Sequence, residues 1–215
     1  MTTTPDPITI ALAQLPVSKA AVDDNLQMHL SYIERAAALG ANVVAFPELS
    51  LTGYELALFS QLAMPHDVTT FAALSATAEV NNIVVIAGCP LHNPNGKPHI
   101  AAVICFPSGE HTFYLKQHLH EGEDAYCAHG CESGRINVNG TRIALAVCAD
   151  FTYPSHAATA AAQQADVYLA SALISLPRRL CTRCRTARRH RKAPPTAGTA
   201  RQPRFYYGRM ANLWQ

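Results

Sequence analysis

Short apolar runs alternate with stretches of helical spacing along most of the chain. The run over residues 8–15 predicts a strand, which we expect to be central in its sheet. Apolar positions then recur at the spacing of one helix face and stop at Gly40, with Asp23 or Asp24 as the candidate N-cap. The apolar run 43–47 follows directly. This part of the sequence therefore predicts a β-α-β unit.

The same pattern continues to about Ser175. Helical spacing returns over residues 68–80 and 154–164, and further apolar runs predict strands at 83–87, 100–106, 112–115, 136–138, 142–147 and 167–170. Two turn sequences, residues 107–110 (PSGE) and Asn139-Gly140, are typical of hairpins between antiparallel strands. The pattern therefore predicts an α/β fold whose sheets are mixed.

Composition narrows the class of protein. The 215 residues, of which 49% are hydrophobic, are enough for one well-buried domain. The N-terminal residues show no export signal, and no stretch approaches the roughly 20 apolar residues that cross a bilayer. We therefore expect a cytoplasmic protein that is not bound to a membrane, with its seven cysteines as reduced thiols.

Charge divides the chain at Leu176. Up to this residue the chain holds six Lys and Arg against all fifteen Asp and Glu, whereas the rest holds eleven Lys and Arg and no acid. We therefore expect two parts: a folded domain at residues 1–176, and a basic, Pro- and Arg-rich tail at 177–215 with irregular structure. Translation in a shifted reading frame would explain this basic composition. A tail that binds nucleic acid would also have such a composition.

Three reactive side chains follow apolar runs. Glu48 ends the run 43–47, Lys116 ends the run 112–115, and Cys148 ends the run 143–147. Ligands bind at the C-terminal ends of strands in open α/β sheets, so these side chains are candidates for one site. A thiol near its free pKa needs a base, and a tetrahedral intermediate needs a positive charge beside it. Glutamate, lysine and cysteine meet these needs.

The sequences around these residues resemble a known family. Residues 46–54 (FPELSLTGY), 114–119 (YLKQHL) and 146–150 (AVCAD) are similar, in order, to the three signature blocks of the nitrilase-like carbon-nitrogen hydrolases. The resemblance runs from about Ile8 to Ser175. It implies an αββα sandwich with mixed sheets, which would be incomplete at the C-terminus if the family's last elements are missing.

The resemblance also implies roles for residues. Glu48 matches the general base, Lys116 the cation that stabilises the intermediate, and Cys148 the nucleophile. Glu123 matches a second glutamate of the family, with Glu121 as the competing choice.

Other positions are implied to contact the substrate. Ala149 would lend its backbone N–H to the oxyanion hole, and Tyr54 and Phe151 are further candidates. Ser155 stands where many members carry an acidic residue, which leaves the substrate open.

The chain also carries metal-ligand residue types. His118, His120 and His129 share a loop with Cys127 and Cys131, but their spacing matches no closed four-ligand pattern. A second set, Cys181, Cys184 and His190, lies in the tail and supplies at most three ligands. The thiol mechanism needs neither a metal nor a cofactor, so we expect none.

We therefore expect a hydrolase that cleaves the C–N bond of a small linear amide or carbamoyl compound, or less favourably a nitrile, with water as co-substrate. Two alternatives remain: a catalytically weak or inactive scaffold of the same family, and a basic-tailed protein that binds nucleic acid, which we do not favour. The sequence leaves open the substrate, whether the chain is active, and whether it forms a homo-oligomer.

Overall fold

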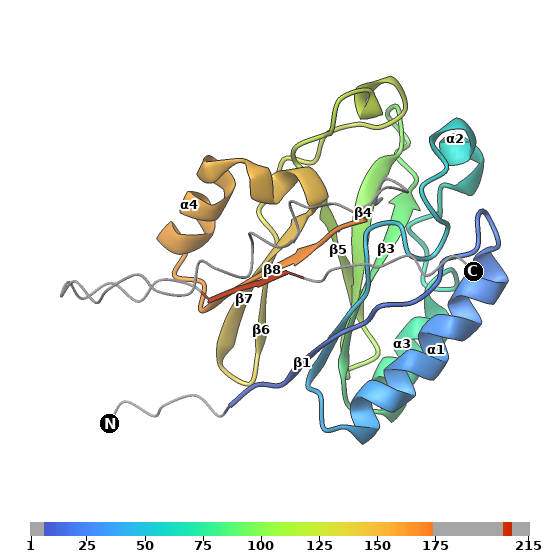
Figure 1. Cartoon of the computed structure of the whole chain (residues 1–215). Coiled ribbons are helices and arrows are strands. Elements are labelled where there is room, and N and C mark those ends of the chain that lie inside the picture. The colour runs from blue at the N-terminus through green and yellow to red at the C-terminus, as the bar shows by residue number, and fades with distance from the viewer. Residues whose placement is uncertain (1–6, 174–203, 208–215) are drawn as a thin grey trace, which may run out of the picture.

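The structure is a computed structural model that describes residues 7–173 and 204–207. It contains two β-sheets (Figure 1). The first has the order β1-β2-β3-β4-β5 and the second the order β6-β7-β8-β9. The strands are β1 (Ile10–Leu12), β2 (Val43–Ala45), β3 (Val84–Leu91), β4 (His99–Cys105), β5 (His111–Leu115), β6 (Arg135–Val138), β7 (Thr141–Val147), β8 (Val167–Ser171) and β9 (Arg204–Tyr207).

Both sheets are mixed. In the first sheet β1, β2 and β3 run parallel, while the β3–β4 and β4–β5 pairs are antiparallel. In the second sheet β6 and β7 form an antiparallel hairpin, and β7, β8 and β9 run parallel. Both hairpins expected from the turn sequences are confirmed.

The two sheets pack face to face. Their shared core joins Val43 and Ile86 of the first sheet to Leu145 and Leu169 of the second. Helices cover the outer faces, so the layers run helix, sheet, sheet, helix (Figure 1). The described helices are α1 (Val22–Ala38), α2 (Phe59–Leu62), α3 (Ala72–Val80) and α4 (Pro154–Ala162), with short 3-10 turns η1 (Leu56–Leu58), η2 (Glu123–Ala125) and η3 (Cys148–Thr152). The αββα sandwich is therefore confirmed.

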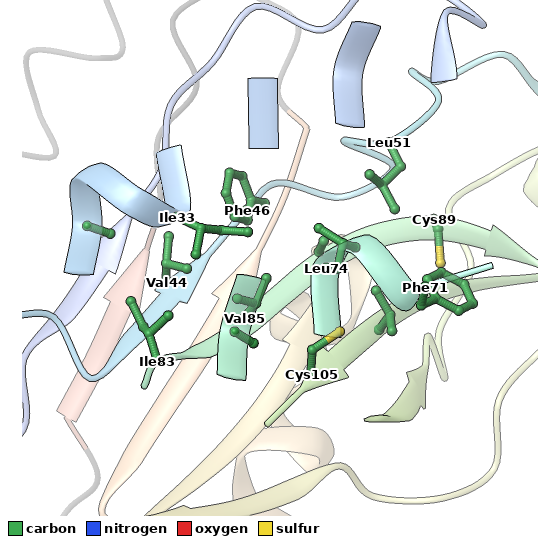
Figure 2. Packing of buried hydrophobic residues seen from close by; sticks show 14 of the residues in the cluster. Ile33, Val44, Phe46, Leu51, Phe71, Leu74, Ile83, Val85, Cys89 and Cys105 are labelled. Carbon is green, nitrogen blue, oxygen red and sulfur yellow. The ribbon is translucent and has the colours of Figure 1, made fainter. Parts of the chain in front are cut away.

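The outer cores explain which helix face is buried. Ile33 of α1 and Leu74 of α3 pack onto Val44 and Val85 of the first sheet, as Figure 2 shows. On the other side, Ala160 of α4 packs with residues of β7 and β8. The buried side of α1 is not wholly apolar, because it includes Asn25 and His29 besides Ile33 and Ala36.

Several details differ from the sequence expectations. Strand β1 lies at the edge of its sheet and not at its centre, because an apolar run marks burial on both faces and not the number of neighbouring strands. Helix α1 has Ala21 at its N-cap, without a side-chain cap. Asp23 and Asp24 lie in its first turn, where negative charge still favours the helix dipole.

The expected irregular tail also contains regular structure. Residues Arg204–Tyr207 form β9, which pairs in parallel with β8. This contradicts the expectation for these four residues, because strand pairing depends on a distant partner that composition does not reveal. The remainder of the segment 177–215 lies outside the described residues.

Candidate active site

The three reactive side chains lie just beyond the C-terminal ends of strands. Glu48 follows β2, Lys116 follows β5 directly, and Cys148 follows β7 directly. Strand β5 runs antiparallel to β4, which runs antiparallel to β3, so β2 and β5 end at the same edge of their sheet. Strand β7 brings Cys148 to this edge from the facing sheet.

Lys116 is the centre of a buried ionic cluster. Its Nζ donates to Glu48 Oε1 at 2.7 Å and lies 3.0 and 2.8 Å from Oε1 and Oε2 of Glu123. The exposed fractions of the three residues are 1% or less. Because a buried charge without a partner is costly, this arrangement keeps the lysine ammonium and its carboxylates in fixed positions.

Glu123 is held from two further sides. The Tyr54 hydroxyl donates to its Oε1 at 2.6 Å, and the His120 backbone N–H donates to its Oε2 at 2.7 Å. Glu121, the other candidate in this loop, is exposed. The structure therefore places Glu123, and not Glu121, against Lys116.

Cys148 lies at a sharp turn between β7 and η3. Its φ is +46°, a left-handed conformation that residues with a Cβ adopt rarely. The thiol lies within the electrostatic influence of both Glu48 and Lys116. Burial, followed by the negative charge of Glu48, raises the pKa of the thiol to about 12, although Lys116 opposes this. The resting thiol is therefore protonated, and the Glu48 carboxylate is the nearby group that could take its proton.

The charges in the cluster also shift the pKa values of its other members. Burial and the negative charge of Glu123 raise the pKa of Glu48, and the positive charge of Lys116 lowers it. The net effect is a raised pKa. Burial lowers the pKa of Lys116, but Glu48 and Glu123 outweigh it and raise that pKa overall. Lys116 therefore stays protonated, and Glu48 is a stronger base than a free carboxylate.

The turn that carries Glu48 is fixed by helix α1. The buried His29 ring donates from Nδ1 to the Asn25 carbonyl (2.6 Å), so its Nε2 accepts from the Ser50 hydroxyl (2.9 Å). The Ser50 oxygen in turn accepts from the Gly88 N–H of β3 at 3.2 Å. Burial lowers the pKa of His29 to about 4, which keeps the ring neutral and able to accept.

Gly88 lets β3 approach this turn closely. A Cβ at Gly88 would clash with Leu49 N and Pro47 O and would lie 2.8 Å from Glu48 C. We expect Gly88→Ala to lower the free energy of unfolding by about 1 to 3 kcal/mol and to reduce turnover, because backbone atoms beside Glu48 must move. Gly96→Ala, where the nearest atom is 3.8 Å away, is the matched control. Equal unfolding midpoints in denaturant for the two variants would contradict this.

Asp150 is fully buried, and the sequence predicted no role for it beyond its place in the motif 146–150. Its carboxylate accepts backbone hydrogen bonds from Gln117 and His118, which follow Lys116, and from Val147, which precedes Cys148. The signal that could have found it is its position two residues after the candidate nucleophile.

The remaining candidates divide into two groups. Ala149 is buried in η3 beside Cys148, and Tyr54 contacts Glu123. Phe151 packs with the core beneath α4, whereas Cys148 packs with the core between the sheets. The structure thus brings Tyr54 to Glu123 and Ala149 beside Cys148, while Phe151 contributes to the core beneath α4.

The metal-ligand residue types of the loop around His118 do not form a metal site. Within residues 7–173 and 204–207, no group of three or more His, Cys, Asp or Glu side chains has the geometry to hold a metal ion. Cys181, Cys184 and His190 lie outside the described residues. No helix in the described part of the chain is both long and apolar enough to span a lipid bilayer.

Comparison with known proteins identifies the family of this chain. The model of the carbon-nitrogen hydrolase family matches residues 9–202. The match extends past Ser175, so the expectation that the resemblance ends there is wrong. That boundary was based on the change in composition, and composition does not show whether the order of residues still matches a family.

Curated relatives are similar over most of this chain. The 2-oxoglutaramate amidase of Bacillus subtilis is 27% identical over 173 residues, which are 79% of this chain and 66% of the relative. A hydrolase of Mycobacterium tuberculosis is 32% identical over 157 residues, 68% of this chain and 54% of the relative. The formamidase of Pseudomonas syringae is 24% identical over 80% of this chain and 54% of the relative. The chain thus spans two thirds or less of the length of these relatives.

Solved structures share the fold. A mutant of the amidase from Nesterenkonia sp. AN1, with acrylamide added at its active-site cysteine, has a TM-score of 0.73 and 23% identity, covering 80% of this chain and 69% of the amidase. Another mutant of that amidase, in complex with butyramide, has a TM-score of 0.72.

Proposed function

This chain belongs to the carbon-nitrogen hydrolase family, and we propose that it hydrolyses a small linear amide or carbamoyl compound through a thioester on Cys148. The buried Glu48–Lys116–Glu123 cluster, with the Cys148 thiol close enough to feel the charges of Glu48 and Lys116, is the observation that carries this proposal. It joins a nucleophile, a base and a cation in one site.

Acylation would begin with transfer of the thiol proton to Glu48. The sulfur attacks the carbonyl carbon, and the oxyanion that forms is stabilised by the charge of Lys116 and by the Ala149 N–H. Glu48 then gives the proton to the departing nitrogen as the C–N bond breaks, so ammonia or an amine leaves and the acyl group remains as a thioester.

Deacylation would use the same carboxylate. Glu48 takes a proton from a water molecule, whose oxygen attacks the thioester carbon. The carbon–sulfur bond breaks, the proton returns to the sulfur, and a carboxylic acid leaves. Glu123 would keep Lys116 in place through both steps, and its negative charge would raise the proton affinity of Glu48.

Two observations support a short amide as substrate. The fold matches an amidase that has been captured with butyramide, and two curated relatives are named 2-oxoglutaramate amidase and formamidase. Tyr54, whose hydroxyl donates to Glu123 and which is only partly buried, would contact the acyl group in this proposal.

Ammonia release from formamide, acetamide, butyramide, a carbamoyl compound and a short nitrile tests this function. We expect release from at least one amide or carbamoyl compound and less from the nitrile. A folded protein that releases ammonia from none of them would contradict the proposal. Release from the nitrile alone would reassign the substrate class.

The pH dependence tests the role of Glu123. Glu48 must be ionised to act, so kcat/KM should fall as the pH drops through its pKa, which lies above the usual 4.5. Because the charge of Glu123 raises this pKa, Glu123→Gln should move the acid limb to lower pH while it lowers the maximal rate. Glu121→Gln is the matched control and should change neither. An unmoved acid limb in Glu123→Gln would contradict the coupling.

A further inference from the structure

One oxygen of the Asp150 carboxylate is bound to the segment that follows Lys116. Oδ1 accepts from the backbone N–H groups of Gln117 (3.1 Å) and His118 (2.8 Å) and from the His118 ring at 3.0 Å. The His118 ring also stacks on Tyr153, with centroids 4.0 Å apart. This oxygen therefore fixes the backbone directly after the candidate cation.

The other oxygen is bound to the segment that carries Cys148. Oδ2 accepts from the backbone N–H of Val147 at 3.0 Å and from the Tyr114 hydroxyl at 2.7 Å. Val147 directly precedes Cys148, and Tyr114 lies two residues before Lys116. The Asp150 carboxylate, which is fully buried, thus touches the chain on both sides of the candidate site.

A chain of hydrogen bonds holds this carboxylate from behind. Because a carboxylate accepts the Tyr114 proton, the Tyr114 oxygen must accept from His156 Nε2 (2.9 Å), and His156 Nδ1 must accept from the Tyr168 hydroxyl (2.7 Å). This tautomer requires a neutral His156, and burial lowers the pKa of that ring. Each group in this chain therefore donates its hydrogen bond in the same direction, from Tyr168 through His156 and Tyr114 to Asp150.

The two ends that Asp150 connects belong to different sheets. Lys116 follows β5 of the first sheet, and Cys148 follows β7 of the second, so no shared strand ladder sets the distance between them. A displacement of about 1 Å in a reacting group can slow an enzyme roughly 100-fold. A side chain that bonds to both ends can supply this missing constraint.

We propose that Asp150 is a positioning residue that fixes Lys116 relative to Cys148, and that Tyr114 and His156 hold its carboxylate in place. The role rests on the proposed function, in which both side chains act on the same carbonyl group. Asp150 itself does not touch the reacting atoms.

The first test compares Asp150→Asn with Asp166→Asn in the full chain. An amide has one acceptor oxygen and cannot accept at both positions, so we expect kcat to fall about 100-fold with KM changed much less. Asp166 is a matched control, since its carboxylate bonds to the Arg142 backbone N–H and side chain at the opposite end of β7. Asp166→Asn should lower the thermal midpoint without changing kcat.

A second variant covers the case in which Asp150→Asn does not fold. Tyr114→Phe removes one hydrogen bond to Asp150 and keeps the buried ring, so it should fold and lower kcat by a smaller factor, about tenfold. Normal kcat in Tyr114→Phe, or normal kcat in a folded Asp150→Asn, would overturn the proposal.

A readout that needs no substrate separates this proposal from the proposed function. The rate at which iodoacetamide alkylates Cys148 depends on the pKa of the thiol, which Lys116 lowers and Glu48 raises. Asp150→Asn should change the pH profile of alkylation, and Asp166→Asn should not. If the parent hydrolyses no amide, the proposed function fails, but a changed profile would still support the positioning role. An unchanged profile in folded Asp150→Asn would overturn it.

Discussion

Cys148→Ala should leave a folded protein that releases no ammonia from any amide the parent hydrolyses. The substitution removes the only atom that forms the proposed thioester, so no alternative nucleophile remains at the end of β7. Its cost in the free energy of unfolding should be at most about 1 to 2 kcal/mol, because alanine accepts the same backbone conformation about as readily as cysteine.

The matched control is Cys131→Ala, which removes an exposed free thiol and should keep full turnover. Mass spectrometry after treatment with iodoacetamide should find an adduct on Cys148 in the parent and none in Cys148→Ala at that position. Retained hydrolysis by the purified Cys148→Ala protein would sink the nucleophile assignment.

Local patterns predicted most elements of this fold. Strands β3 to β8 and helices α1, α3 and α4 lie where the apolar spacing placed them, because burial on one face or two leaves a period in the sequence. The two hairpins follow from turn residues that favour reversal. These features depend on neighbours along the chain, so sequence alone can carry them.

The order of strands within each sheet was harder to predict from the sequence. Strand β1 has the apolar composition of a central strand but lies at an edge, and β9 lies in a segment whose composition indicated irregular structure. Both are decided by long-range pairing. The family resemblance predicted the αββα sandwich, but it predicted neither the edge position of β1 nor the presence of β9.

The site shows the same division. Glu48, Lys116 and Cys148 could be named as candidates because each follows an apolar run within a motif. The choice of Glu123 over Glu121 needed the structure, since the two residues share one acidic loop and differ only in which points toward Lys116. The contacts of Asp150 and of His29 with Ser50 were invisible in the sequence, because each joins segments far apart along the chain.

The electrostatics show why the proposed nucleophile Cys148 would need Glu48 as a base. The thiol has a pKa of about 12, so almost none of it is ionised at neutral pH without a base. Each unit of pKa difference between thiol and carboxylate adds about 1.4 kcal/mol to the proton transfer. Burial and the charge of Glu123 raise the pKa of Glu48 and narrow this difference. The second carboxylate of the cluster therefore makes the first one a better base.

Glu48→Gln should slow acylation by about 10²- to 10⁴-fold while substrate binding is largely kept, because the amide retains the shape of the side chain and loses the base. Rapid-quench measurement of the first turnover should locate the effect in thioester formation. Glu55→Gln, in the same loop region and paired with Lys19 at the surface, is the matched control and should acylate at the parent rate.

The same variant should make the Cys148 thiol more acidic. Burial and then the charge of Glu48 raise the pKa of the thiol, whereas Lys116 lowers it. Removing the charge leaves the lysine as the nearest strong influence, so the pH profile of alkylation by iodoacetamide should move below about 12, to lower pH than in the parent. The variant would then combine a more ionised thiol with slower acylation, which only the loss of a proton carrier explains. If Glu48→Gln were acylated at the parent rate, Glu48 would not be the base, and Glu123 would be the next candidate.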